Sequence, residues 1–181
     1  STAEKFSSLT VPMTALGGGA LKVASDFDGS MVHIQNALGL TGEEAKALQD
    51  TVQEVWKKGF GESLDEVSNA AIQVKQNMKG LDNGYVEKAT KNALLLAQTY
   101  ESDVNEVTRA ANSLMQNFGL TGEEAFDKLA NGAKNGMNFS NEMFDNLSEY
   151  TINFQEAGFA VDEMFSMLTN GAKKGYNLDR L

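Results

Sequence analysis

The chain has 181 residues, of which 41% are apolar, and it carries 25 acidic against 15 basic side chains, for a net charge of −10. This length can bury a hydrophobic core, whereas the acidic balance argues against a surface that neutralises phosphates, so we expect no direct nucleic-acid binding. Cysteine is absent and histidine occurs once, which excludes disulfides, thiolate zinc sites and clusters of histidine ligands.

Residues 1–19 form the first predicted segment, a flexible or partly helical lead-in. Its apolar residues keep no sustained period, and residues 17–19 are three consecutive glycines, which favour a joint. The apolar run at 11–21 is too short to span a bilayer and lacks the order of a secretory signal, so we expect no transmembrane segment. Because the chain begins with Ser1 rather than Met, we expect it to be a piece of a longer protein.

A turn sequence recurs along the chain at a spacing of about forty residues. Residues 39–45 read Gly-Leu-Thr-Gly-Glu-Glu-Ala, and the same seven residues stand eighty positions later at 119–125. Related turns begin between and after them, with Gly-Leu-Asp at 80–82 and Gly-Phe-Ala at 158–160. Glycine favours the left-handed conformation that ends many helices. We therefore predict turns at Gly39, Gly80, Gly119 and Gly158.

An apolar stripe with helical spacing precedes each of these turns, and each stripe is the previous one displaced by forty residues. Thr151 is the only polar member, and a glycine closes the last stripe. The four stripes are Ala24, Phe27, Met31, Ile34 and Leu38; Leu64, Val67, Ala71, Val74 and Met78; Val104, Val107, Ala111, Leu114 and Phe118; and Phe144, Leu147, Thr151, Phe154 and Gly158.

Each stripe predicts one helix before its turn, and a second helix should follow each turn. The first pair is expected at 20–38 and from 41 to about 58, and the second pair ends its first helix at 78 and resumes near Asp82. Thr41 with Glu44, and Thr121 with Glu124, have the spacing of a capping box, in which hydroxyl and carboxylate each accept a backbone N–H at a helix start. A further repeat links the last two second helices, because residues 129–134 match 168–173 at a spacing of thirty-nine.

These patterns predict an all-α fold of about eight amphipathic helices in four antiparallel hairpins, forming a single all-helical repeat domain over residues 20–181. Two packings fit, a short α-solenoid of stacked pairs or a compact bundle. Phe165, Leu168 and Tyr176 in the last repeat need cover, which favours the compact form slightly.

The sequence offers no convincing catalytic, cofactor-binding or metal-binding residues. Glu43 and Glu44 are adjacent, as are residues 123 and 124, but neighbours on a helix point about 100° apart, so capping explains them better than paired-acid hydrolysis. His33 lies beside an apolar stripe and is interpreted as a rim residue. Trp56, near a hairpin end, is a possible partner contact.

Four stretches deserve to be read together: residues 9–17 (Leu-Thr-Val-Pro-Met-Thr-Ala-Leu-Gly), 22–31 (Lys-Val-Ala-Ser-Asp-Phe-Asp-Gly-Ser-Met), 39–44 (Gly-Leu-Thr-Gly-Glu-Glu) and 171–175 (Gly-Ala-Lys-Lys-Gly). They resemble, in order and over nearly all of the chain, the core region of bacteriophage tail tape measure proteins. Asp28 stands where that family usually has glutamate, a mild departure.

The resemblance implies a structural role without catalytic residues. Tape measure proteins of phages and prophages lie extended inside a growing tail tube, set its length and leave the virion ahead of the DNA at genome ejection. The expected location is thus the tail interior of the virion, after synthesis in the bacterial host cytoplasm. Expected partners are tail tube proteins, assembly chaperones and the rest of the parent chain.

Two alternatives from other classes stay open at this stage. The forty-residue period alone also fits a helical-repeat adaptor or scaffold domain that binds a protein partner. A cell-wall hydrolase is the less favoured alternative, since some tape measure proteins carry such domains elsewhere. The sequence leaves open the oligomeric state, the particular partner, the host, and whether the domain stays folded inside the tube.

Overall fold

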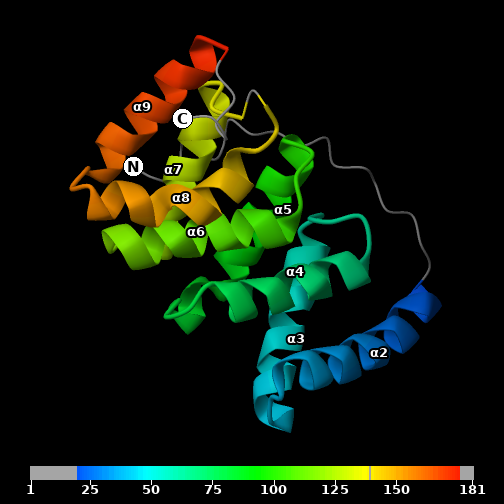
Figure 1. Ribbon diagram of the computed structural model, residues 1–181. Helices are drawn as coiled ribbons and strands as arrows, with labels where there is room; N and C mark the ends of the chain where they lie inside the picture. Colours follow the sequence, from blue (N-terminus) through cyan, green and yellow to red (C-terminus); the bar gives the residue numbers. More distant parts are fainter. Residues whose placement is uncertain (1–19, 139, 176–181) are drawn as a thin grey trace. The chain divides into compact units, whose positions relative to one another are not determined.

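The computed structural model describes residues 20–138 and 140–175, and the side chains within them from residue 28 on. All regular secondary structure in these residues is helical, which confirms the predicted all-α class (Figure 1). The predicted lead-in at 1–19 lies outside the described residues. In chain order the elements are α2 (Ala20–Leu38), α3 (Gly42–Lys57), α4 (Leu64–Asn77), η1 (Asn83–Tyr85), α5 (Val86–Thr99), α6 (Val104–Phe118), α7 (Gly122–Lys134), α8 (Met143–Glu156) and α9 (Val161–Lys173).

The chain divides into two compact units, one ending at Leu95 and the other beginning at Leu96. The division falls within α5, whose residues 92–97 are all buried. Each unit contains about two of the four predicted forty-residue repeats. That residues 20–181 act as a single domain stays a prediction.

In the first unit, α2, α3 and α4 pack against one another. Ile34 on α2, Val52 and Val55 on α3, and Val67 on α4 are completely buried, as their places in the apolar stripes require. Two hydroxyls are buried with them, and the Oγ atoms of Ser30 and Ser68 lie 2.6 Å apart. A hydrogen bond thus satisfies both polar groups where α2 crosses α4.

The helix expected to resume near Asp82 begins as a 3-10 turn, and the α-helix starts only at Val86. The Asp82 carboxylate accepts a hydrogen bond from Gly84 N at 2.8 Å and so caps the start of this 3-10 turn. Lys58, which follows α3, forms an ion pair with Glu87 in the first turn of α5, with 2.6 Å between Lys58 Nζ and Glu87 Oε1. This hydrogen bond from Lys58, with a second from Lys91, lowers the pKa of Glu87 below its ordinary value.

In the second unit, α6 packs against both α7 and α8, and its contact with α8 is the most extensive between any two described helices. Ala110 and Ala111 are fully buried on α6. Such small side chains let two helix backbones approach closely. The approach is close enough for Ser113 Oγ to reach the Ser148 carbonyl on α8 at 3.5 Å.

The predicted apolar stripes are the buried faces of these helices. Every member with a described side chain is buried or half-buried except Gly158, which sits in a turn. Thr151, the polar member, is also buried and donates its hydroxyl hydrogen bond to the Leu147 carbonyl one turn back. The side chains of Ala24 and Phe27 lie outside the described residues.

The last predicted hairpin is more open than the others in its unit. Figure 1 shows α9 turning away from α8 instead of lying along it, and the close contacts of α8 are with α6. Phe165 and Leu168, which needed cover, are nonetheless buried. Tyr176 lies outside the described residues, and the choice between bundle and solenoid stays a prediction.

Candidate interaction site

The four predicted turn glycines lie in the left-handed region of backbone conformation. The φ angles are 62° at Gly39, 78° at Gly80, 67° at Gly119 and 85° at Gly158. Each glycine follows a helix of the sequence stripes, so the left-handed conformation recurs at all four turns. These glycines form the turns that follow helices, and they carry no reactive group.

Thr41 and Glu44 form a complete capping box at the start of α3. The Glu44 carboxylate accepts hydrogen bonds from Thr41 N at 3.0 Å and from Thr41 Oγ1 at 2.8 Å, and Glu44 N donates to Thr41 Oγ1 at 3.4 Å. The hydrogen bonds from Thr41, the backbone one first, lower the pKa of Glu44. The role of this carboxylate is therefore to cap the start of α3.

Thr121 and Glu124 repeat the arrangement at the start of α7. The corresponding distances are 2.8 Å and 2.9 Å to the carboxylate and 3.2 Å from Glu124 N to the hydroxyl. The pKa of Glu124 is lowered by the same two hydrogen bonds from Thr121. Identical sequences eighty residues apart thus give the same local structure.

The fourth turn lacks half of this cap, because Ala160 stands where threonine stands in the other two. Ala160 N still donates to Glu163 Oε2 at 2.8 Å, but no hydroxyl is present to accept from the backbone of α9. Phe159, which replaces the leucine of the other turns, is 37% exposed and packs edge-on against Phe154 at 5.8 Å between ring centres.

The remaining residues singled out from the sequence stand apart from one another. Trp56 is half-buried on the last turn of α3, and its role as a partner contact stays a prediction. His33 is exposed on α2, where its Nε2 lies 2.8 Å from Asn69 Oδ1. In the part of the chain that the structure describes, no three metal-binding side chains come together, and no helix is long and apolar enough to cross a membrane.

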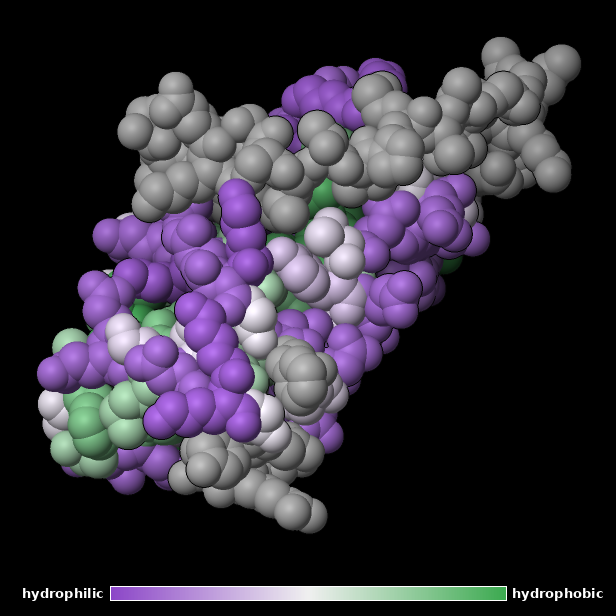
Figure 2. Space-filling model, turned by 90° about the horizontal axis from the view of Figure 1, so that it is seen from above, coloured by the Kyte–Doolittle hydropathy of each residue, from purple (hydrophilic) through white to green (hydrophobic). Residues whose placement is uncertain are grey.

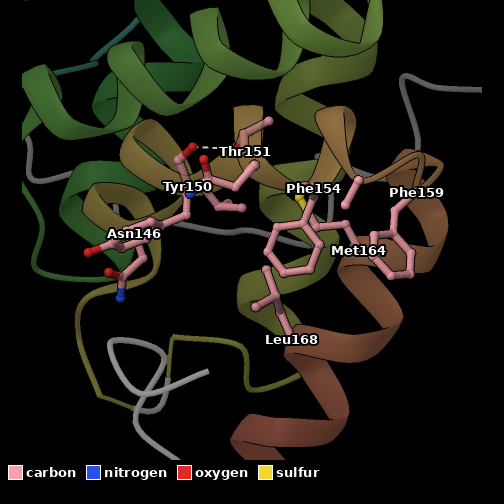
Figure 3. Close-up of a pocket in the computed structure, with 10 residues that line it drawn as sticks. Asn146, Tyr150, Thr151, Phe154, Phe159, Met164 and Leu168 are labelled. Atoms are coloured by element: carbon pink, nitrogen blue, oxygen red, sulfur yellow. Dashed lines mark hydrogen bonds between the residues drawn. The ribbon is translucent and has the colours of Figure 1, made fainter.

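An apolar opening in the second unit lies between α8 and α9, where the two helices diverge (Figure 3). It has a volume of about 330 Å³. We call it the α8–α9 groove. Its lining residues are Asn146, Leu147, Tyr150, Thr151, Asn153, Phe154, Ala157, Phe159, Met164 and Leu168.

The three aromatic rings of the α8–α9 groove are spread along its length. Figure 3 shows Phe154 beside Leu168, with Phe159 and Met164 on one side and Tyr150 with Asn146 on the other. Tyr150 is 42% exposed, although it is a large aromatic residue. Seen from above, the end of the molecule where Figure 1 places the α8–α9 turn carries apolar, green residues among hydrophilic, purple ones (Figure 2).

A second opening lies on the other side of α9, against α7, and its lining is more polar. Asn131 and Asn170, which correspond in the thirty-nine-residue repeat, both line it. Between these helices Gly132 is buried, and Lys128 forms an ion pair with Asp162. The second internal repeat thus reflects two related helices that face each other.

A family model for phage-related minor tail proteins matches residues 54–181. The chain belongs to this family. No curated protein and no solved structure matches it. As a phage-related minor tail protein, the chain has a structural role in a phage tail and a virion-associated location, and its partners are other tail components.

Sequence reasoning did not predict the α8–α9 groove in this phage tail protein. Leu147 and Phe154 were predicted to face a core, and they do line an apolar space, but the stripe alone gives no angle between α8 and α9. Two signals were available in the sequence. Tyr150 and Ile152 extend the apolar surface of α8 beyond its stripe, and the fourth turn carries Phe159 and Ala160 in place of leucine and threonine.

Proposed function

We propose that this minor tail protein segment is a non-catalytic domain of a tail tape measure protein, acting in tail assembly, length determination and genome delivery. The observation that carries the proposal is the family match at 54–181 together with the ordered resemblance to tape measure proteins. Three of the four stretches behind that resemblance, at 9–17, 22–31 and 39–44, precede residue 54. The two lines of support therefore draw largely on different parts of the chain.

The fold supports a mechanical role. One acid of each pair that could have served hydrolysis is bound at a helix start, where Glu44 forms a capping box with Thr41 and Glu124 forms one with Thr121. The apolar residues pack between helices. The motifs that recur most closely in the sequence form turns and helix caps. A cell-wall hydrolase gains no support from this arrangement.

An in-register deletion in the parent phage tests the proposal. Removing residues 39–118 joins residue 38 to the second copy of Gly-Leu-Thr-Gly-Glu-Glu-Ala and so preserves the turn and cap at the junction. The deletion removes eighty residues, which as continuous helix would span about 120 Å. We expect tails shortened by up to that length, measured by electron microscopy of purified virions.

The matched control keeps the length and damages the fold. Leu114 and Phe126 are completely buried, so replacing both with aspartate disrupts the second unit without removing a residue. If the number of residues in the segment contributes to the tail length, the control phage keeps the tail length of the parent phage. Deletion tails of unchanged length, together with normal infection, would contradict the proposed function.

A further inference from the structure

The helix that forms one wall of the α8–α9 groove is acidic on its outer surface. Between Met143 and Glu156, α8 carries three acids and no base. Glu149 and Glu156 are exposed, and neither has an ion-pair partner in the described part of the chain. Their spacing from the groove residues at 146, 150, 153 and 157 puts both carboxylates along one flank of the opening.

Among the residues that the structure describes, no lysine or arginine lines the groove. Its wall is formed by the apolar surfaces of Phe154, Phe159, Met164 and Leu168, with acids beside it. A partner that fills such a groove buries apolar side chains and gains from positive charge at its edges. Strongly acidic or uncharged partners meet the same apolar wall without the favourable charge.

We propose that the α8–α9 groove binds a basic amphipathic helix of a partner protein, with apolar side chains inserted between α8 and α9 and lysine or arginine facing Glu149 and Glu156. Helix-in-groove recognition uses anchors at helical spacing, and α8, at 14 residues and about 21 Å, offers room for two or three of them. The volume of about 330 Å³ is of the size of a small ligand pocket.

A buried amide gives a second, independent reason to expect an occupant. Asn146 is 7% exposed and lines the groove next to Tyr150, yet its Nδ2 has no hydrogen-bond partner among the residues that the structure describes (Figure 3). An unpaired buried donor is costly, so native proteins rarely retain one without a role. In the complex, a carbonyl or side-chain oxygen of the bound helix accepts this hydrogen bond.

The inference does not rest on the tape measure assignment. It concerns which kind of tail component or other protein the groove holds, and it is tested in solution with the chain alone. Unchanged tail length in the deletion phage would leave it standing, and failure of the binding experiment would leave the tail-length experiment unaffected.

The probe is a fluorescein-labelled helical peptide of about four turns composed of leucine and lysine, with the leucines at helical spacing on one face. Binding to the full 181-residue chain is followed by fluorescence anisotropy at low and at physiological salt. One comparison peptide keeps the leucines and replaces lysine with glutamate. A second keeps the lysines and replaces leucine with serine, which reports attraction to the net charge alone.

The variants separate the apolar, charged and amide contributions. Phe154→Ala removes the central ring, and Ile152→Ala is its control, because Ile152 is 45% exposed on the same helix outside the groove. The double variant Glu149→Lys with Glu156→Lys reverses the charge at the rim of the groove. A double reversal at Asp50 and Asp65, both exposed in the other unit, changes the net charge equally.

We expect the leucine–lysine peptide to bind at least tenfold more tightly than either comparison peptide. Phe154→Ala and the rim reversal should each weaken binding tenfold or more, and both controls should change it less than twofold. Asn146→Leu should raise the melting temperature of the free chain, because the unpaired donor is gone, while weakening peptide binding. A merely structural asparagine would not give these opposite signs.

Three results would overturn the proposal. The first is equal binding of the leucine–lysine and leucine–glutamate peptides, or no binding of either, as would occur if another part of the chain filled the groove. The second is retention of full affinity by Phe154→Ala. The third is a dimer, seen by light scattering, that Phe154→Ala splits and the peptide leaves intact, since the groove would then hold a second copy of the chain.

Discussion

Thr41 and Thr121 show how much one side chain can fix at a helix start. Each threonine accepts from the backbone of its own helix and donates to a glutamate three residues later, while its N–H is held by the same carboxylate. Of the expectations drawn from the sequence, this local geometry was the most accessible, because it depends on residues only three positions apart. At Ala160 the same reasoning identifies a missing contact.

Ala160→Thr should stabilise the protein by about 1 kcal/mol, because the hydroxyl completes the cap of α9. The backbone already has the required conformation, with φ −74° and ψ 156° at Ala160 against −69° and 162° at Thr121. Urea unfolding followed by circular dichroism measures the change. Thr121→Ala is the reverse control and should lose a similar amount, and a destabilised Ala160→Thr variant would contradict the interpretation.

Glu106, near the start of α6, should destabilise the folded chain at neutral pH. Partial burial, with the neighbouring charges of Asp145 and Asp103, raises the pKa of its carboxyl. The folded chain therefore binds this proton more tightly than the unfolded chain, so its unfavourable contribution grows as pH rises above about 4.3, the usual glutamate pKa.

Glu106→Gln removes that unfavourable contribution and keeps a side chain suited to the third position of a helix. The variant should be more stable than the parent at pH 7, and the difference should vanish below about pH 4 as the glutamate of the parent protonates. Denaturant titrations of both proteins at the two pH values provide the comparison. A stability difference that is the same at both pH values would show that charge is not the cause.

At the scale of elements, glycine inside α7 has a packing role. A Cβ at Gly132 would lie 3.0 Å from Met143 Cε, 3.0 Å from Phe165 Cε1 and 3.1 Å from Met137 Sδ. Alanine favours a helix by up to about 1 kcal/mol over glycine, whereas overpacking a core costs about 1–3 kcal/mol. Three tight neighbours around one position make the second effect the larger.

Gly132→Ala should therefore destabilise the protein, by about 1 kcal/mol after the helix-propensity gain is counted. Gly42→Ala is the matched control, since Gly42 is also helical and a Cβ there meets nothing within 4 Å. Thermal unfolding of the two variants beside the parent is sufficient. Equal stability of Gly132→Ala and Gly42→Ala would show that the neighbours of Gly132 give way easily.

The helices themselves were largely predictable, because each needed only an apolar stripe and a turn. The helix expected to start near Asp82 differs in the type of its first turn: Asp82 caps a 3-10 turn over Asn83–Tyr85, and the α-helix follows from Val86. No local feature of the sequence predicts that α9 diverges from α8. This divergence depends on how α8 lies on α6, which forty-residue periodicity does not specify.

At the scale of the whole molecule, α5 links the two units as one unbroken helix. Helix formation is cooperative, and a helix that melts on one side of Leu95 loses hydrogen bonds on the other. We therefore expect the chain to unfold as a single domain. Trp56, the only tryptophan, reports by fluorescence on the first unit, whereas circular dichroism reports on all helices.

Leu129→Ala provides the test, because Leu129 is completely buried in the second unit and its truncation should cost about 2–5 kcal/mol. The denaturation midpoint of Trp56 fluorescence should fall together with that of circular dichroism. Ile152→Ala, at an exposed position of the same unit, should leave both midpoints in place. An unchanged fluorescence midpoint with a two-step dichroism curve would show two independent domains.

Two identical heptapeptide turns, eighty residues apart, also bear on how such a gene can evolve. Where the coding stretches of these two turns also match, unequal recombination between them inserts or removes four whole helices without shifting a helical face or losing a cap. A protein built this way changes size in fixed steps, each already foldable. Natural relatives of different lengths should therefore differ by multiples of the same step.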